Sequence, residues 1–165
     1  MVSKSDVALN IDRVASFGGV VRDVEGVWKI GFNRNLGDFY SPNVFLVELL
    51  AVQSAINLII NLDFPQVIVE SDSIDVVNLL DGQDVSSHQY EHNVLDILQL
   101  KAAHGALVIR YAPRELNSLV DFLAKVGLSL DFGTHTFDSP FGECHSLLFR
   151  DLTLSPIPPV GSSIR

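Results

Sequence analysis

Four carboxylates, far apart along the chain, are of the type that together could bind metal ions. Hard divalent cations such as Mg²⁺ and Mn²⁺ prefer oxygen ligands of this kind. Carboxylates that cluster without a cation repel one another and their pKa values rise, and a divalent cation would remove that repulsion. The four residues are Asp12, Glu48, Asp72 and Asp121.

Each of the four carboxylates also has an ordinary structural interpretation. Glu48 is the only charge in a strongly apolar helical stretch, where it could face solvent on a polar side. Asp72 directly precedes a predicted helix and could cap it. Asp121 has Lys125 four residues further on, the spacing of a surface ion pair, and Asp12 could start a turn. Only the set of four, taken together, points to a site.

The elements that must position these carboxylates follow from the spacing of apolar residues. The order β-β-β-α-β-α-α-β-α is predicted, with a loop over 35–38. The predicted strands are 7–11, 17–22, 27–32, 66–70 and 106–111, and the predicted helices are 43–62, 71–80, 92–103 and 116–126. A leading meander followed by crossovers indicates an α/β fold, a mixed sheet with helices packed on it. If its first and fourth strands are neighbours, the four carboxylates could converge at one edge.

The C-terminal part of the chain differs from the rest. Periodicity is lost after about Asp131, and residues 155–159 are rich in proline. The length of 165 residues fits one domain with a tail. We therefore predict a domain over 1–130 and a C-terminal extension with a loose proline-rich tail over 131–165.

The charges are unevenly distributed. Twenty acidic and eleven basic residues give a net charge of −9, and no Lys or Arg lies between Asn35 and Leu100. This balance argues against a protein that coats nucleic acid through many phosphate contacts. The single cysteine, Cys144, excludes an internal disulfide, and neither a secretory signal nor a membrane span is recognisable. We expect a soluble intracellular protein, with nucleus or cytoplasm left open.

Several motifs follow one another in a specific order and spacing over about residues 7–130. They are Gly18-Gly19-Val20-Val21-Arg22-Asp23 with Gly26-Val27-Trp28, Val47-Glu48-Leu49 with Ala51, Glu70-Ser71-Asp72-Ser73, Arg114-Glu115-Leu116-Asn117 and Val120-Asp121-Phe122-Leu123-Ala124-Lys125. With them the sequence resembles the type 1 ribonuclease H domain, in the reverse-transcriptase-like form found in plant genomes as a retroelement-derived module. The stretches 135–140 and 146–148 resemble the tail that often follows this module.

The resemblance implies a ribonuclease H-like fold, a five-stranded mixed sheet flanked by helices. Asp12, Glu48, Asp72 and Asp121 match the family's metal-binding catalytic acids. Two Mg²⁺ or Mn²⁺ ions would act on the scissile phosphate in the RNA strand of an RNA/DNA hybrid. The implied substrate-binding residues are Ser73, Asn117 and Arg114, of which Ser73 and Asn117 could instead have a capping role. A neighbouring reverse transcriptase or other domain is the implied protein partner.

Three departures from the family pattern leave a second hypothesis open. Arg13 follows Asp12 where the family usually has glycine, and Tyr111 stands where cellular members carry a histidine. The segment 81–93, often basic in cellular enzymes, contains no Lys or Arg here. The chain is thus expected to be either a weakly binding nuclease or a catalytically degenerate module that binds nucleic acid or protein. A related 3′–5′ exonuclease would need an Asp-x-Glu pair, which Asp12-Arg13-Val14 does not supply.

Overall fold

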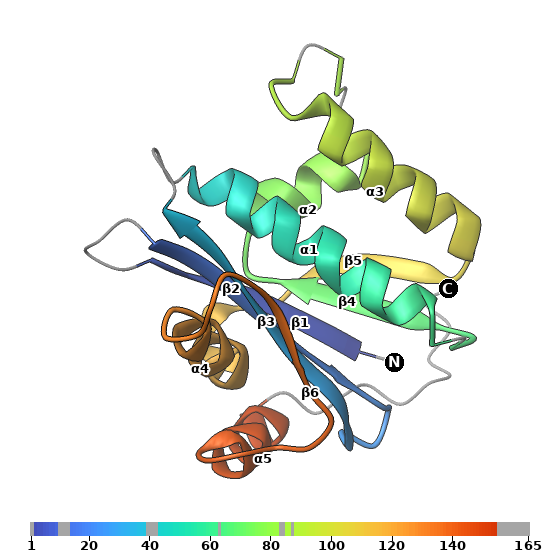
Figure 1. Cartoon of the computed structure of the whole chain (residues 1–165). Coiled ribbons are helices and arrows are strands. Elements are labelled where there is room, and N and C mark those ends of the chain that lie inside the picture. Colours follow the sequence, from blue (N-terminus) through green and yellow to red (C-terminus); the bar gives the residue numbers. More distant parts are fainter. Residues whose placement is uncertain are drawn as a thin grey trace.

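The computed structural model has one mixed sheet with a layer of helices on each face (Figure 1). It describes residues 2–9, 14–38, 43–62, 64–82, 85–86 and 88–154, with residues 2–9 described by their backbone. The elements in chain order are β1 (Val2–Leu9), β2 (Val14–Arg22), β3 (Trp28–Asp38), α1 (Val44–Ile60), β4 (Val67–Ser71), α2 (Ile74–Leu80), α3 (Glu91–His104), β5 (Leu107–Tyr111), the 3₁₀ helix η1 (Arg114–Leu116), α4 (Ser118–Gly127), β6 (Gly133–Phe137) and α5 (Cys144–Leu154).

The first strand lies at the centre of the sheet, whose order is β5-β4-β1-β2-β3-β6. β1 pairs antiparallel with β2 and parallel with β4, and β4 pairs parallel with β5. The antiparallel half continues through β3 to β6. Because β1 and β4 are parallel neighbours, residues at the ends of these two strands meet at the same edge of the sheet.

Two separate hydrophobic clusters hold the helices to the two faces. The larger cluster packs β-strand side chains such as Phe17 and Val69 against α1, α2 and α3, including Leu49 and Ile56. The smaller cluster lies under α4 and α5. Its buried members are Val20, Trp28, Leu119, Val120, Leu123 and Cys144. The division agrees with Figure 1, where α1, α2 and α3 lie on one face and α4 and α5 on the other.

Close contact between α4 and β2 depends on a glycine. A Cβ atom on Gly18 would lie 2.5 Å from the backbone nitrogen of Ala124 and 2.9 Å from the Cβ of Leu123. The amide of Asn33 on β3 donates to the carbonyl of Leu123, and that of Asn35 donates to the carbonyl of Leu130. The sheet thus fixes both the distance and the rotation of the helix that carries Asp121.

The structure confirms the ribonuclease H-like fold class and corrects several details of the prediction. The sheet has six described strands rather than five. The first strand was expected over 7–11 but is found at Val2–Leu9, and β3 extends through the predicted loop to Asp38. Residues beyond 131 were expected to be irregular, yet β6 joins the sheet edge and α5 packs on α4. The extension through Leu154 is therefore continuous with the core of the domain, whereas the proline-rich stretch lies outside the described residues.

In the described part of the chain, no helix combines the length and apolar character needed to cross a membrane.

Candidate metal site at the sheet edge

Glu48 lies near the start of α1, a helix capped by the Asn43 side chain. It is half-buried, and its carboxylate accepts a hydrogen bond from the hydroxyl of Ser73. Burial raises the pKa of Glu48, and the charges of Asp72 and Asp75 raise it further, while the Ser73 hydrogen bond and Arg114 oppose the rise. A partly desolvated carboxylate with a fixed orientation and acidic neighbours is suited to binding a cation.

Asp72 is the first residue after β4 and stands two residues before α2 begins. The helix cap is Ser73, whose hydroxyl accepts from the amide of Val76, so Asp72 is not needed as the cap. Burial raises the pKa of Asp72, and Asp121 adds to the rise while Arg114 lowers it. The ordinary interpretation of Asp72 as an N-cap is therefore wrong, because Ser73 holds that role.

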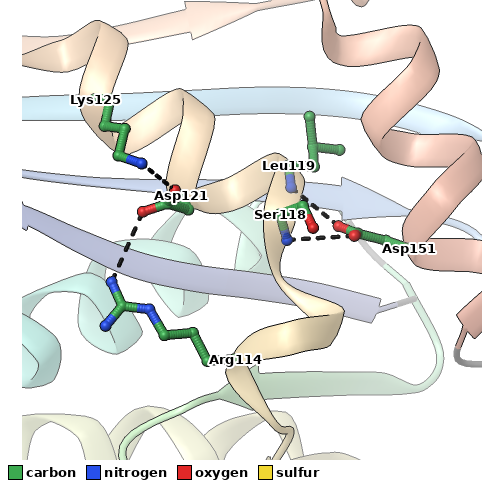
Figure 2. A network of polar contacts seen from close by, with 6 residues as sticks. All are labelled: Arg114, Ser118, Leu119, Asp121, Lys125 and Asp151. Atoms are coloured by element: carbon green, nitrogen blue, oxygen red, sulfur yellow. Dashed lines mark hydrogen bonds and ion pairs between the residues drawn. The ribbon is translucent and has the colours of Figure 1, made fainter.

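Asp121 lies in the first turn of α4 and is held by two cations (Figure 2). Lys125 Nζ is 2.5 Å from one carboxylate oxygen, and Arg114 Nη2 is 3.8 Å from the other. The surface ion pair between Asp121 and Lys125, which the sequence suggested as the ordinary interpretation of Asp121, is therefore present. Arg114 nevertheless links this pair to the other acids, since its charge also acts on Glu48 and Asp72.

Of the four predicted acids, Asp72 interacts electrostatically with both Glu48 and Asp121, whereas Asp12 lies outside the described residues. In the parts of the chain that are described with side chains, no group of three or more metal-ligating residues lies close enough to hold an ion.

The register of β1 brings a further acidic residue, Asp6, to the same edge of the sheet. Ser5 pairs with Ser71, the last residue of β4, so that Asp6 on β1 and Asp72, the first residue after β4, come next along the two parallel chain segments. Asp6 is also the Cα partner of Gly18, the residue on which α4 packs closely. The pairing of β1 with β2, a strand that the sequence does predict, is the feature that could have pointed to Asp6.

The predicted substrate-binding residues have distinct surroundings. Ser73 is buried and engaged with both Glu48 and α2, and Arg114 is 67% exposed beside Asp121. Asn117 is fully buried at the start of α4, and its amide group finds no hydrogen-bond partner in the described part of the chain.

Two buried charges behind the site were not foreseen from the sequence. Asp151 of α5 is 2% exposed and accepts hydrogen bonds from the amides of Ser118 and Leu119 (Figure 2). Arg22 at the end of β2 is also 2% exposed. Burial lowers the pKa of Arg22, while the charges of Glu70 and Asp151 favour its ionised form. In sequence both residues look like ordinary surface charges, because only the tertiary fold buries them.

Similar proteins were found by sequence. Residues 4–127 match the model of the reverse transcriptase-like family. A "putative ribonuclease H protein" of Arabidopsis thaliana is 33% identical over 144 residues, which cover 84% of this chain and 22% of that protein. The chain therefore spans about a fifth of the length of this relative.

Similar solved structures include LC11-RNase H1, isolated from compost, in complex with an RNA/DNA hybrid, and RNase H1 of the archaeon Halobacterium salinarum. Both have a TM-score of 0.68, at 19% and 20% identity, and each match covers 78% of this chain and 96% of the other. The foamy viral protease-reverse transcriptase in complex with an RNA/DNA hybrid follows, with a TM-score of 0.63 and 16% identity over 77% of this chain and 19% of that one.

At identities this low, the similarity to these structures shows the fold alone. The family is shown by the match of the family model to about three quarters of the sequence. The chain belongs to the reverse transcriptase-like family and has the fold of ribonuclease H.

Proposed function

We propose that this chain is a divalent-metal-dependent endonuclease that hydrolyses the RNA strand of RNA/DNA hybrids. The observation that carries the proposal is the interaction of Asp72 with Glu48 on α1 and with Asp121 on α4. Burial raises the pKa values of Glu48 and Asp72, the charge of Asp72 raises that of Glu48 further, and the charge of Asp121 raises that of Asp72. The family match and the plant relative support the same reaction class.

The donor set fits Mg²⁺ or Mn²⁺. All three residues offer hard oxygen ligands, and the repulsion of Glu48 by Asp72 and of Asp72 by Asp121 is the kind that bound divalent cations relieve. We propose Asp6 as the acid of the first strand in place of Asp12, because the register puts Asp6 beside Asp72. Asp121 would exchange its contacts with Lys125 and Arg114 for a contact with an ion.

Two ions bound by these carboxylates would polarise the scissile phosphate, activate the attacking water and stabilise the leaving 3′-oxygen. The residues of the chain around them orient the ligands. Ser73 holds the Glu48 carboxylate by a hydrogen bond, and exposed Arg114 can contact a substrate phosphate beside Asp121. The full burial of Asn117 favours a role in shaping the start of α4 over direct contact with substrate.

A second candidate function is a module that keeps the fold and binds nucleic acid or protein without cleaving. Two observations favour it. Tyr111 is 46% exposed at the end of β5, at the position where cellular members of the family carry a histidine. The segment between α2 and α3, over 81–90, contains acidic residues and no Lys or Arg.

Cleavage of a labelled RNA/DNA hybrid by the purified chain separates the two functions. We expect products with millimolar Mg²⁺ or Mn²⁺, none with chelator, and none from Asp72→Asn. Asp138→Asn is the matched control, because Asp138 is an exposed carboxylate in the loop after β6 and its loss should leave cleavage intact. An intact hybrid at millimolar Mn²⁺ would remove the nuclease proposal, and binding without cleavage would favour the second function.

A further inference from the structure

A groove of about 490 Å³ opens beside Asp121, between α4 and α5. One wall comes from η1 and α4 and the other from α5. The lining residues are Arg114, Glu115, Ser118, Asp121, Phe122, Lys125, Glu143, Leu147 and Arg150. Leu147 and Arg150 lie on α5, and Glu143 directly precedes this helix at the spacing of the same helix face. This wall belongs to the extension beyond the family match, which ends at residue 127.

Exposed positive charges gather in this groove. Arg114 and Lys125 are 67% and 64% exposed, and Arg150 is exposed and forms no ion pair within the described part of the chain. The other cations with described side chains are buried, half-buried or paired with a carboxylate. They are Arg22 and Arg34, Lys29 with Asp23, Lys101 with Asp81, and Arg110 with Glu70.

The acids in the groove do not cancel these charges when the neighbouring site is loaded. Asp121 is the carboxylate that Arg114 and Lys125 now contact. A divalent cation at Asp121 would neutralise that carboxylate, so that the charges of Arg114 and Lys125 could act on an anion in the groove. Glu115 and Glu143 remain and oppose anion binding, and the three cations outnumber them.

We propose that this groove binds backbone phosphates of the nucleic acid held at the site, with Arg150 as the contact that the extension contributes. The inference rests on the proposed function, because it takes an RNA/DNA hybrid as the ligand. The groove would also supply positive charges that the segment 81–90 lacks, since that segment contains no Lys or Arg to hold a hybrid. Leu147 and Phe122, both partly buried, form the apolar part of the lining between the charged rims.

Fluorescence anisotropy with a labelled RNA/DNA hybrid tests this inference in the full chain, in an Asp72→Asn background that leaves the hybrid intact, at millimolar Mn²⁺, to which Glu48 and Asp121 still offer carboxylate ligands. The loss of one phosphate contact lowers affinity at 0.1 M salt by about 5–8-fold and reduces the salt slope of log Kd by about 0.7–0.9. We expect this change for Arg150→Gln. Lys101→Gln, which removes one charge from α3 on the opposite face of the sheet, should change Kd by less than about twofold.

A third variant separates a phosphate contact from loss of structure. Glu143→Gln removes an acid from the same groove, directly before α5, and should tighten binding, whereas damage to α5 would weaken binding in both Glu143→Gln and Arg150→Gln. The inference is overturned if Arg150→Gln binds like its parent, if Glu143→Gln and Arg150→Gln weaken binding alike, or if the parent does not bind the hybrid at 50 mM salt.

Cleavage measured in parallel, in the chain with Asp72 intact, keeps the two proposals apart. Cleavage together with an unchanged affinity of Arg150→Gln would refute the groove alone. Binding that depends on Arg150 without any cleavage would refute the nuclease function and leave the groove in place.

Discussion

Asp151 caps a helix to which it does not belong: its carboxylate accepts a 3.0 Å hydrogen bond from the amide of Leu119, 32 residues earlier (Figure 2). The amide of Ser118 donates to the same carboxylate, at 3.3 Å, while the N-cap residue Asn117 makes no side-chain capping bond. The first amides of a helix have no partner within the helix, and negative charge is favoured there. The extension thus holds the helix that carries Asp121.

Asp151→Ala should therefore destabilise the whole domain, not only α5. Loss of the cap, with loss of a carboxylate that stabilises buried Arg22, should cost about 2 kcal/mol, or a fall in Tm of roughly 4–8 °C for a domain of this size. Thermal unfolding followed by circular dichroism measures this fall in Tm. Asp138→Ala, which removes an exposed carboxylate from the preceding loop, is the control, and equal Tm values for the two variants would contradict the capping role.

The order of elements up to α4 was predictable because apolar periodicity and turn residues are strong there. Helices α1 and α4 have continuous buried faces, such as Val47, Val52 and Ile56 on α1, and their predicted bounds differ from the observed ones by about two residues. Glu48, Asp72 and Asp121 could be grouped in advance for the same reason: each lies on or beside an element that was correctly identified.

Elements with few buried residues were missed. β6 is an edge strand in which half-buried and exposed residues alternate, and in α5 only Cys144 and Asp151 are buried, one of them a charge. β1 was shifted because its outer residues, Ser3, Lys4 and Ser5, are polar although the strand is central. Its position is set by pairing with β2 and β4 on both sides, which local propensity does not contain.

The shift of β1 leads to a direct comparison of two candidate acids. Asp6→Asn should abolish hybrid cleavage and weaken the rise in Tm that Mn²⁺ produces, because the register puts residue 6 beside Asp72. Asp12→Asn should retain both within about twofold. Both variants make the same chemical change six residues apart, so each is the control for the other. Loss of cleavage in Asp12→Asn alone would restore the assignment made from the sequence.

The close approach of α4 to the sheet yields a further prediction. Gly18→Ala would push a methyl group against the backbone of Leu123 and Ala124, which cannot move aside as a flexible side chain could. We expect a loss of about 1–3 kcal/mol and a weaker response of Tm to Mn²⁺, because α4 and Asp121 must shift outward.

Val20→Ala is the comparison for Gly18→Ala. Val20 lies on the same strand as Gly18, is 1% exposed and belongs to the smaller hydrophobic cluster under α4 and α5. Its truncation removes apolar contacts without pushing α4 outward. It should lower Tm and keep the Mn²⁺ response near that of the parent. A normal Mn²⁺ response in Gly18→Ala would show that the position of α4 is not set by this contact.

The raised pKa of Glu48 means that ionisation of this residue lowers the free energy of unfolding of the metal-free protein. Burial and the charges of Asp72 and Asp75 hold the pKa of Glu48 above its ordinary value of 4.5. Between the ordinary and the raised pKa the folded state binds more protons than the unfolded chain, so stability falls as pH rises through this interval. Glu48→Gln, which cannot ionise, should therefore have a higher Tm than the parent at pH 7, by roughly 2–4 °C if the relief is about 1 kcal/mol. The gain in Tm should vanish below pH 4.5 and shrink at pH 7 when Mn²⁺ neutralises the parent's site.

Melting curves of both proteins between pH 4 and 8, with and without Mn²⁺, measure this difference in Tm. A gain that did not depend on pH would mean that the charge of Glu48 is not what destabilises the fold.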